Sequence, residues 1–471
     1  MLQFVTPTGS ISPIHSKDVA FSRLGIGLEK LDRNLYSPAP LFDPIAELGV
    51  KWVRLQSGWQ RTETEKGVYH FEWLDDIVDN LLRRGLVPWI CLCYGNRLYD
   101  KQAAERFGGV GCPPTFGDEQ TAAWSRYTEA VVRHFKGRID WWEIWNEPDC
   151  DYSWRFQCNP LEYIEMAKKT AEAIRKGNPE AKIIGGSLAF SDLDYVIPLL
   201  DNGLVDFCDA VTFHIYSSND IYDQTRIDNL KEVVRRYNPA TEIIMGEGGC
   251  QSRNNGAGAL TGQAWTEEKQ ARSLARHVIS NLHDDLKFVS VFSCADMAEA
   301  LNGKVGEAAS YNDFGYFGVM GAEFDSDGVF TGSYRRKPSF RALQTIAAIF
   351  KGEFSVAHIP LAQIDNQYSV HYNNMGTDLT DCKCCGFRKP NGSAAVALWK
   401  PTNILSETYE GAIYLKFAMV PHEKVQLVDM LDGTIYELPA DSIERKESGT
   451  LALKHIPLLD SPVLVAFGDF F

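Results

Sequence analysis

The chain has 471 residues, of which 45% are hydrophobic and 23% are charged, and its formal net charge is −15 at pH 7. These proportions are typical of a globular protein and exclude a largely disordered chain. The length suits a large domain with a smaller accessory module. The acidic balance argues against a nucleic-acid-binding protein, which needs a basic face. It argues more weakly against a polyanionic substrate, because a local basic pocket could override the global sign.

No stretch of the sequence is apolar for long enough to span a membrane, and residues 1–18 lack the basic start and apolar run of a secretory signal. The 11 cysteines are odd in number and irregularly spaced, which favours reduced thiols. A cytoplasmic protein is therefore expected, with an exported protein whose signal has been removed as the alternative. Cys382, Cys384 and Cys385 form the only dense cluster, and no Cys or His pair at zinc spacing completes four ligands, so no metal is expected.

Short apolar runs alternate with helical patterns over residues 21–350. Eight such pairs can be counted, which predicts a (β/α)8 barrel of the α/β class. In the helix expected after the second strand, apolar residues recur at i, i+3, i+4, i+7 and i+8, as one buried stripe requires. These residues are Leu74, Ile77, Val78, Leu81 and Leu82.

The pattern changes at residue 351, where the apolar residues begin to alternate with a period of two. Alternation of this kind predicts strands with one buried face, and Asp432-Gly433 is a strong signal for a hairpin turn. Residues 351–471 are therefore predicted to form an antiparallel β-sandwich. Residues 1–20 have no helical period and could add a strand to it.

Two of the predicted barrel strands end at a glutamate. The apolar run Trp141–Trp145 stops at Asn146-Glu147-Pro148, and a later run ends at Glu247 before two glycines. Barrel strands present their C-terminal residues to the active-site face, and the fourth and seventh strands lie on opposite sides of it. Hydrolysis of a glycosidic bond with retention needs two carboxyl groups about 5–5.5 Å apart, one ionised and one protonated. The two glutamates are therefore candidates for this chemistry.

Structural interpretations compete for each of these residues. Glu147 alone could be a salt-bridged loop acid, and Glu247 could belong to a tight turn. Arg54, at the end of the second strand, could be a structural ion-pair partner. His214 could be a core histidine, and Glu143 is expected to be a buried barrel acid without a catalytic part.

The string Trp145-Asn146-Glu147-Pro148, together with a glutamate on the seventh strand, resembles the retaining glycosidases of clan GH-A, which are built on (β/α)8 barrels. Within the clan the chain is most similar to glycoside hydrolase family 39, which includes β-xylosidases, iduronidases and related endo-acting enzymes. The similarity extends to residues 67–96, 209–216, 315–319 and 337–343. It implies cleavage of a β-type glycosidic bond through a covalent glycosyl-enzyme intermediate, without a metal or organic cofactor.

The resemblance also implies a role for each matching residue. Glu147 would be the general acid/base and Glu247 the nucleophile. Asn146 would hydrogen-bond the sugar 2-hydroxyl, and Arg54 would orient the nucleophile and keep it ionised. His214 and Tyr216 on the sixth strand would hydrogen-bond the pocket and the nucleophile, respectively.

Aromatic residues stand in the loops after the second, third and fourth strands, where they could stack on a sugar face. These residues are Trp59, Tyr94 and Trp154, and each could equally be a packing residue.

The sequence departs from the clan at the end of the eighth strand. Enzymes of this clan usually place a tryptophan there as the floor of the glycone subsite, whereas this chain has Ser293 and Cys294. The pocket could be more open, or Trp265 or Phe314 could fill it.

These observations predict a retaining glycoside hydrolase acting on an oligosaccharide, a polysaccharide or a glycoside. The expected partner is a carbohydrate, and neither a nucleic acid nor a membrane is expected. One alternative is a carbohydrate-binding pseudoenzyme on the same barrel, which the altered eighth strand would support. A second alternative is an inverting hydrolase, which would require a wider gap between the two carboxyl groups.

Overall fold

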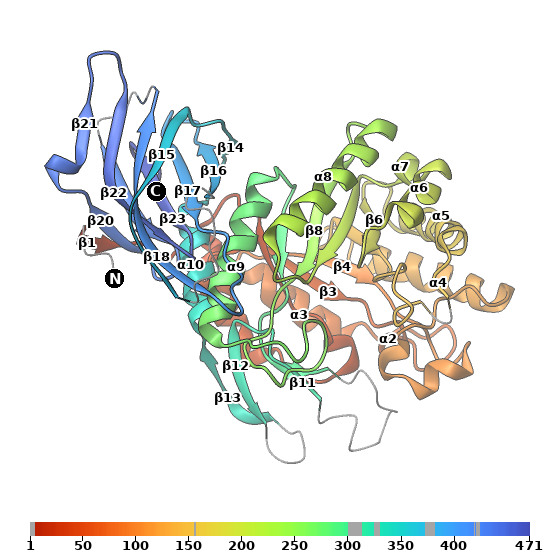
Figure 1. Cartoon of the computed structure of the whole chain (residues 1–471). Coiled ribbons are helices and arrows are strands. Elements are labelled where there is room, and N and C mark those ends of the chain that lie inside the picture. The colour runs from red at the N-terminus through yellow and green to blue at the C-terminus, as the bar shows by residue number, and fades with distance from the viewer. Residues whose placement is uncertain are drawn as a thin grey trace.

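The computed structural model describes residues 5–154, 157–299, 313–324, 330–372, 382–418, 420 and 424–471. The chain forms a barrel, which carries its helices on the outside, and a C-terminal β-structure packed beside it (Figure 1). Among the described residues, no helix combines the length and apolarity needed to cross a membrane.

Eight parallel strands close the barrel in chain order, because the first strand, β2, pairs with both β3 and the last strand, β9. The strands are β2 (Leu24–Gly27), β3 (Trp52–Gln56), β4 (Val87–Leu92), β5 (Trp141–Ile144), β6 (Lys182–Leu188), β7 (Ala210–Ile215), β8 (Glu242–Gly248) and β9 (Val289–Val291). They coincide with the eight predicted runs, and the predicted (β/α)8 barrel is confirmed.

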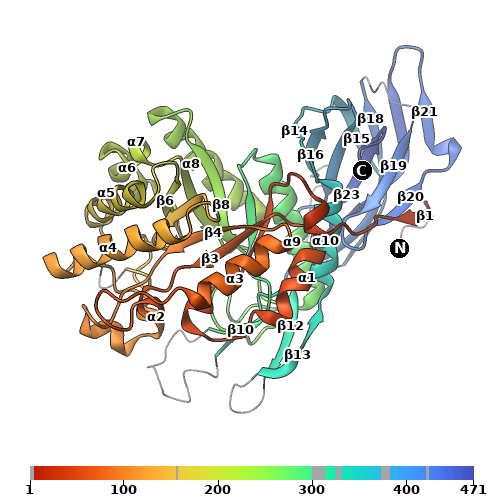
Figure 2. The ribbon, with the colours of Figure 1, turned by 180° about the vertical axis from the view of Figure 1, so that it is seen from behind.

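Helices cover the outside of the barrel, as the view from behind in Figure 2 shows. The α-helices are α1 (Phe42–Glu47), α2 (Trp59–Thr62), α3 (Glu72–Arg83), α4 (Asp118–His134), α5 (Pro160–Gly177), α6 (Leu193–Asp201), α7 (Leu204–Phe207), α8 (Asp220–Tyr237), α9 (Glu267–His283) and α10 (Pro338–Ile349). Short 3-10 helices are η1 (Ser16–Asp18), η2 (Leu31–Arg33), η3 (Ala39–Leu41), η4 (Lys101–Glu105), η5 (Phe107–Gly109) and η7 (Ala440–Ser442).

Local sequence signals account for these helices. The apolar stripe predicted for α3 is buried at four of its five positions, and Leu82 is partly buried. Helix α5 begins where Asn159 accepts hydrogen bonds from the backbone N–H groups of Leu161 and Glu162, so that two unpaired donors of the first turn are satisfied. Pro160 occupies the first turn, where a missing N–H costs nothing.

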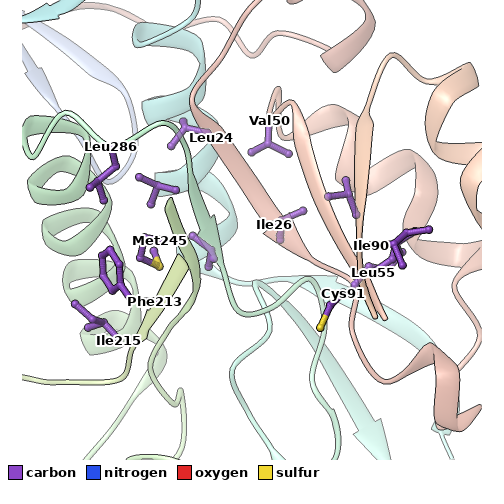
Figure 3. Close-up of a cluster of buried hydrophobic side chains, with 14 of the residues drawn as sticks. Leu24, Ile26, Val50, Leu55, Ile90, Cys91, Phe213, Ile215, Met245 and Leu286 are labelled. Carbon is purple, nitrogen blue, oxygen red and sulfur yellow. The ribbon is translucent and has the colours of Figure 1, made fainter. Parts of the chain in front are cut away.

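Apolar side chains from the strands and the surrounding segments form the buried core (Figure 3). The labelled members are Leu24, Ile26, Val50, Leu55, Ile90, Cys91, Phe213, Ile215, Met245 and Leu286. Trp52 and Phe288 stack with ring centroids 4.4 Å apart, next to a separate buried cluster that includes Trp89 and Ile244. The barrel interior is therefore filled with side chains, and a cavity can open only at its end.

Two antiparallel sheets follow the barrel, as predicted from the period-two pattern. One has the order β1-β20-β19-β23-β17-β16-β14 and the other the order β15-β18-β22-β21. Their strands are β1 (Thr6–Ser10), β14 (Ser355–Val356), β15 (Leu361–Tyr372), β16 (Lys383–Arg388), β17 (Ala394–Trp399), β18 (Thr408–Phe417), β19 (Val425–Asp429), β20 (Thr434–Glu437), β21 (Ile443–Arg445), β22 (Leu451–Leu459) and β23 (Val463–Phe467). Strand β1, from the start of the chain, pairs antiparallel with β20.

The two sheets share a buried apolar core, and α9 and α10 lie between the sandwich and the barrel (Figure 1). The buried guanidinium of Arg276, on α9, donates to the carbonyl oxygens of Lys400, Thr402 and Asp460. Because these carbonyls belong to loops of the sandwich, this buried side chain helps to fix the sandwich to the barrel.

The connection from β9 to α10 carries two short antiparallel pairs. They are β10 (Met297–Ala298) with β11 (Phe314–Gly315), and β12 (Met320–Phe324) with β13 (Phe330–Arg336). This connection brings Glu299 and Phe317 to the end of the barrel at which the strands finish.

Candidate active site

A cavity of about 700 Å³ opens where the barrel strands end. Its lining comes from residues at or just after the C-terminal ends of the strands, which is the functional face of this fold. The lining includes Glu29, Lys30, Gln56, Tyr94, Asn146, Glu147, Phe190, Tyr216, Glu247, Phe292, Glu299 and Phe317.

Glu147 and Glu247 face each other in this cavity. One carboxylate oxygen of Glu147 lies within 4.8 Å of one oxygen of Glu247. Their side chains are 19% and 11% exposed, so solvent and substrate can reach both. The backbone at Glu147 has a φ of 53°, and its N–H donates to the Ser187 carbonyl at 2.8 Å. A positive φ in a non-glycine residue is uncommon and is found most often at functional sites.

His214 connects the two acids. Its Nδ1 lies 2.9 Å from Oε1 of Glu147 and 3.9 Å from Oε2 of Glu247. Burial lowers the pKa of His214, but the Glu247 charge and the hydrogen bond with Glu147 outweigh burial and raise it. The imidazole therefore favours its protonated form over a wider pH range than a free histidine does.

Arg54 is fully buried and holds three side chains at once. Its Nη1 donates to Oε2 of Glu247 at 2.6 Å, and its Nη2 donates to Asn146 Oδ1 at 2.9 Å. Its Nε and Nη2 bind both oxygens of Glu143, at 2.9 and 2.7 Å. The two interpretations of Arg54 therefore coexist, because it is an ion-pair partner of Glu143 and also contacts Glu247.

The environment of Glu247 favours its ionised form. Burial raises the pKa of this carboxyl group, but the charges of His214 and Arg54, and a hydrogen bond donated by the Tyr216 hydroxyl, outweigh burial and lower it. Glu143 is also ionised, and its fully buried carboxylate accepts further hydrogen bonds from Trp89 Nε1 and the Ser187 hydroxyl.

The structure brings the other polar residues predicted for the site together with the two acids. Asn146, Tyr216 and Tyr94 line the cavity, and Tyr94 accepts a hydrogen bond from Gln56.

Trp59 and Trp154 do not line the cavity, and the expectation that they stack on a sugar is wrong. Trp59 is fully buried, stacks on Tyr99 and donates its indole N–H to Glu63. Trp154 is 1% exposed and packs edge-on against Trp145. Both follow barrel strands in the sequence, but their side chains point into the protein between the loops and helices.

The end of the eighth strand also differs from the expectation. Phe292, the residue after β9, lines the cavity, whereas Ser293 and Cys294 are fully buried. Trp265 packs in a separate cluster with Cys250 and Ile404. Phe314 stacks on Phe324 and is not part of the cavity lining. An aromatic floor is therefore present, one residue earlier than expected.

Several charged residues of the cavity were missed from the sequence, among them Glu29, Lys30 and Glu299. Glu29 follows β2 and is 1% exposed, and Lys30 places its Nζ 2.6 Å from Oε2 of Glu299. The rule that selected Glu147 and Glu247, an acid just after a barrel strand, applies equally to Glu29 in the string Gly27-Leu28-Glu29. Glu299 follows the two-residue strand β10, which is not a barrel strand, and carries no comparable signal.

Glu147, His214 and Glu247 are also the single group of three acidic, histidine or cysteine side chains, within the described ranges, that could hold a metal ion. Their oxygen and nitrogen atoms already interact with one another and with Arg54 and Tyr216. We therefore do not interpret the group as a metal centre. Cys382, just before β16, and Cys384, on β16, do not line the cavity, and their sulfur atoms lie 3.8 Å apart.

A carboxylate pair at the end of a (β/α)8 barrel, in a cavity that also offers polar and aromatic side chains, defines a glycosidase. The chain belongs to glycosyl hydrolases family 39, whose family model matches residues 45–364. No curated protein sequence matches the chain significantly.

Solved structures with the same fold include members of this family. The family 39 enzyme from Xanthomonas axonopodis pv. citri is 16% identical, with 97% of this chain and 95% of that chain covered and a TM-score of 0.60. A monomeric β-xylosidase from Caulobacter crescentus is 17% identical, with 97% of each chain covered and the same TM-score. A family 30 subfamily 8 xylanase from Clostridium acetobutylicum is 10% identical, with 98% of this chain and 97% of that chain covered and a TM-score of 0.55.

Proposed function

We propose that the protein hydrolyses a β-glycosidic bond in an oligosaccharide, a polysaccharide or a glycoside with retention of configuration. The observation that carries this proposal is the approach of Glu147 and Glu247 to within 4.8 Å. Retaining enzymes hold their two carboxyl groups about 5–5.5 Å apart, whereas inverting enzymes need about 6.5–9.5 Å to admit a water molecule. The short separation therefore favours retention over inversion.

In the first step, a carboxylate oxygen of Glu247 attacks the anomeric carbon, and the bond from that carbon to the glycosidic oxygen breaks. Glu147 gives its proton to the departing oxygen, so the aglycone leaves as a neutral alcohol. The products of this step are a glycosyl ester on Glu247 and an ionised Glu147. The low pKa of Glu247 supports its role as nucleophile, because it is ionised before substrate binds.

In the second step, water attacks the anomeric carbon, and Glu147 removes one proton from that water. The ester bond to Glu247 breaks and its carboxylate is released, while Glu147 regains the proton lost in the first step. Two inversions at one carbon give overall retention.

The neighbouring residues support these steps. Asn146 uses its Oδ1 to accept from Arg54, which leaves its amide N–H groups free to donate toward a sugar hydroxyl in the cavity. Tyr216 donates to Oε1 of Glu247, and Arg54 donates to Oε2, so each oxygen of the nucleophile is held in place. His214 orients Glu147 through Nδ1.

The test is a panel of aryl β-glycosides, beginning with the β-xyloside because one of the structures with this fold is a β-xylosidase. The configuration of the first-formed sugar is recorded by proton NMR before mutarotation. The proposal expects the β-anomer from a β-glycoside. Formation of the α-anomer would establish inversion, and binding without release of the aryl group would indicate a pseudoenzyme. The aromatic ring of Phe292 in the cavity lining supports a hydrolase over the pseudoenzyme alternative.

A further inference from the structure

Glu29 is a further buried acid in the cavity, and the reaction described above does not use it. It follows β2, and its side chain is 2% exposed. The carboxyl group folds back over Gly27, where a Cβ atom would come within 2.0 Å of Oε2 of Glu29. The absence of a side chain at position 27 therefore creates the space that the carboxyl group occupies.

No other described residue donates a hydrogen bond to either carboxyl oxygen of Glu29, and the one backbone N–H that favours its charged form is its own. The nearest cation is Arg54, whose Nη1 lies 3.5 Å from Oε1 of Glu29. Arg54 already donates to Glu143, Glu247 and Asn146, and Lys30 is paired with Glu299. A buried polar group without a partner is costly unless a ligand supplies one. Because Glu29 lines the cavity, a bound ligand can do so.

The surroundings of Glu29 disfavour its charged form. Its charged and titratable neighbours come from several elements and are Glu247, Arg54, His214, Tyr36, Tyr216 and Cys294. Burial is the largest influence and raises the pKa of Glu29, the Glu247 charge raises it further, and Arg54 only partly opposes them, so that it reaches about 8. At neutral pH, Glu29 is therefore mostly a carboxylic acid.

We infer that Glu29 binds the sugar as a neutral carboxylic acid, donating its proton in a hydrogen bond to a hydroxyl oxygen of the glycone. The inference rests on the proposed function and adds a specificity-determining residue to it. A neutral acid offers both a donor and an acceptor, which matches a hydroxyl group. A carboxylate at the same place would offer only acceptors and would add a second negative charge beside Glu247.

The position of Glu29 places this contact on the glycone. Strand β2 neighbours β9 in the barrel, so Glu29 lies beside Phe292, the aromatic residue that follows β9. Lys30 lies on the same side of the cavity as Phe292, since its Nζ is 5.5 Å from the centre of the Phe292 ring. Tyr152 and Phe190, by contrast, are 38% and 52% exposed and form the outer part of the lining.

The test compares Glu29→Gln with Glu29→Ala at pH 6, on the aryl glycoside that the wild-type enzyme cleaves best. Glutamine keeps a donor and an acceptor but cannot ionise, whereas alanine keeps neither. We expect Glu29→Gln to retain kcat/KM to within about threefold and Glu29→Ala to lose about tenfold or more, as removal of a hydrogen bond to a buried ligand group does. Equal losses in both variants, or wild-type values for Glu29→Ala, would overturn the inference.

The pH profile provides a second readout. With a dinitrophenyl glycoside, whose leaving group needs no protonation, the wild-type kcat/KM should fall as pH rises through about 8, because Glu29 then ionises. Glu29→Gln has no proton to lose and should keep its activity through that range. A fall of the same size and midpoint in Glu29→Gln would contradict the assignment.

A third readout is independent of hydrolysis. Infrared difference spectra of wild type minus Glu29→Gln should show the C=O stretch of a protonated carboxyl group at pH 6 and its loss near pH 8. Absence of that band would show that Glu29 is ionised and would overturn the inference even if Glu29→Ala failed to fold. If the wild-type enzyme hydrolysed no glycoside, the proposed function would fail while the infrared result still decided the protonation state of Glu29.

Discussion

Nη1 of Arg54 lies 2.6 Å from Oε2 of Glu247, and the same guanidinium binds both oxygens of Glu143. Arg54 is thus shared between Glu247, which lines the cavity, and Glu143, which does not. The planar, multidentate guanidinium can satisfy both, which the ammonium group of lysine cannot do. Glu143 binds the guanidinium of Arg54 and so fixes its position. The position of Glu247 therefore depends on Glu143, which does not line the cavity.

Replacement of Arg54 by lysine tests this arrangement. Arg54→Lys keeps the charge but loses the bidentate geometry, so we expect kcat to fall by about 100-fold and the protein to be destabilised, since a buried carboxylate loses its partner. Steady-state kinetics and urea unfolding measure the two effects. Arg84→Lys, in a partly exposed pair with Asp43, is the control and should change neither. Wild-type kcat in Arg54→Lys would show that the contact with Glu247 is dispensable.

The roles proposed for Glu147 and Glu247 are separable. Glu247→Ala should reduce kcat by at least about 10⁴-fold, because no covalent intermediate can form. Glu147→Ala should still cleave glycosides with very good leaving groups, and azide should restore turnover by replacing water in the second step. Glu242→Ala, at the exposed start of the same strand as Glu247, serves as the control. Azide rescue of Glu247→Ala with retained configuration would mean that the roles are reversed.

The low pKa of Glu247 has a consequence for the acidic limb of the pH profile. Glu247 is active only when ionised, so activity is lost as pH falls through its pKa, and a lowered pKa extends activity to lower pH. Tyr216→Phe removes the hydroxyl that donates to Glu247 and should move the acidic limb of kcat/KM upward. Tyr237→Phe, at an exposed hydroxyl, should leave the limb in place. A downward movement in Tyr216→Phe would be contrary to this explanation.

The proposed chemistry needs no metal ion, since two carboxyl groups perform both steps. Dialysis against a chelator should therefore leave kcat and KM unchanged, as measured on the best aryl glycoside. Loss of activity that a divalent cation restores would require Glu147, His214 and Glu247 to be reconsidered as ligands.

Trp59 and Tyr94 should respond differently to truncation. Trp59→Ala leaves a cavity among buried aromatic rings and should lower the free energy of unfolding by about 3–5 kcal/mol, with KM nearly unchanged in the folded fraction. Tyr94→Ala removes a ring that lines the cavity and should act mainly on KM. Urea unfolding and steady-state kinetics distinguish them. A raised KM with normal stability in Trp59→Ala would restore the original expectation of sugar stacking.

The barrel, the sandwich and the presence of Glu147 and Glu247 in the cavity could be predicted because their signals are local in the chain. Strand and helix periods appear within about ten to fifteen residues. An apolar strand that stops at an acid places that acid at the end of the barrel, whichever other strands surround it. Glu147 and Glu247 follow from this rule, and so does Glu29, which the same rule would have selected.

The direction of each side chain, and the groups that it meets, depended on the tertiary structure. Trp59, Trp154 and Tyr94 all follow barrel strands, yet only Tyr94 lines the cavity, because the helices and loops packed outside the barrel enclose the other two rings. Phe292, the residue after β9, lines the cavity, whereas Ser293 and Cys294, where the sequence analysis looked for the tryptophan position, are buried outside its lining. The charges of His214 and Arg54 and the hydrogen bond from Tyr216 lower the pKa of Glu247, whereas burial and the Glu247 charge raise the pKa of Glu29 in the same cavity. The pKa of each carboxyl group is set by its burial and by charged groups on other strands. The local sequence around the residue shows neither of these.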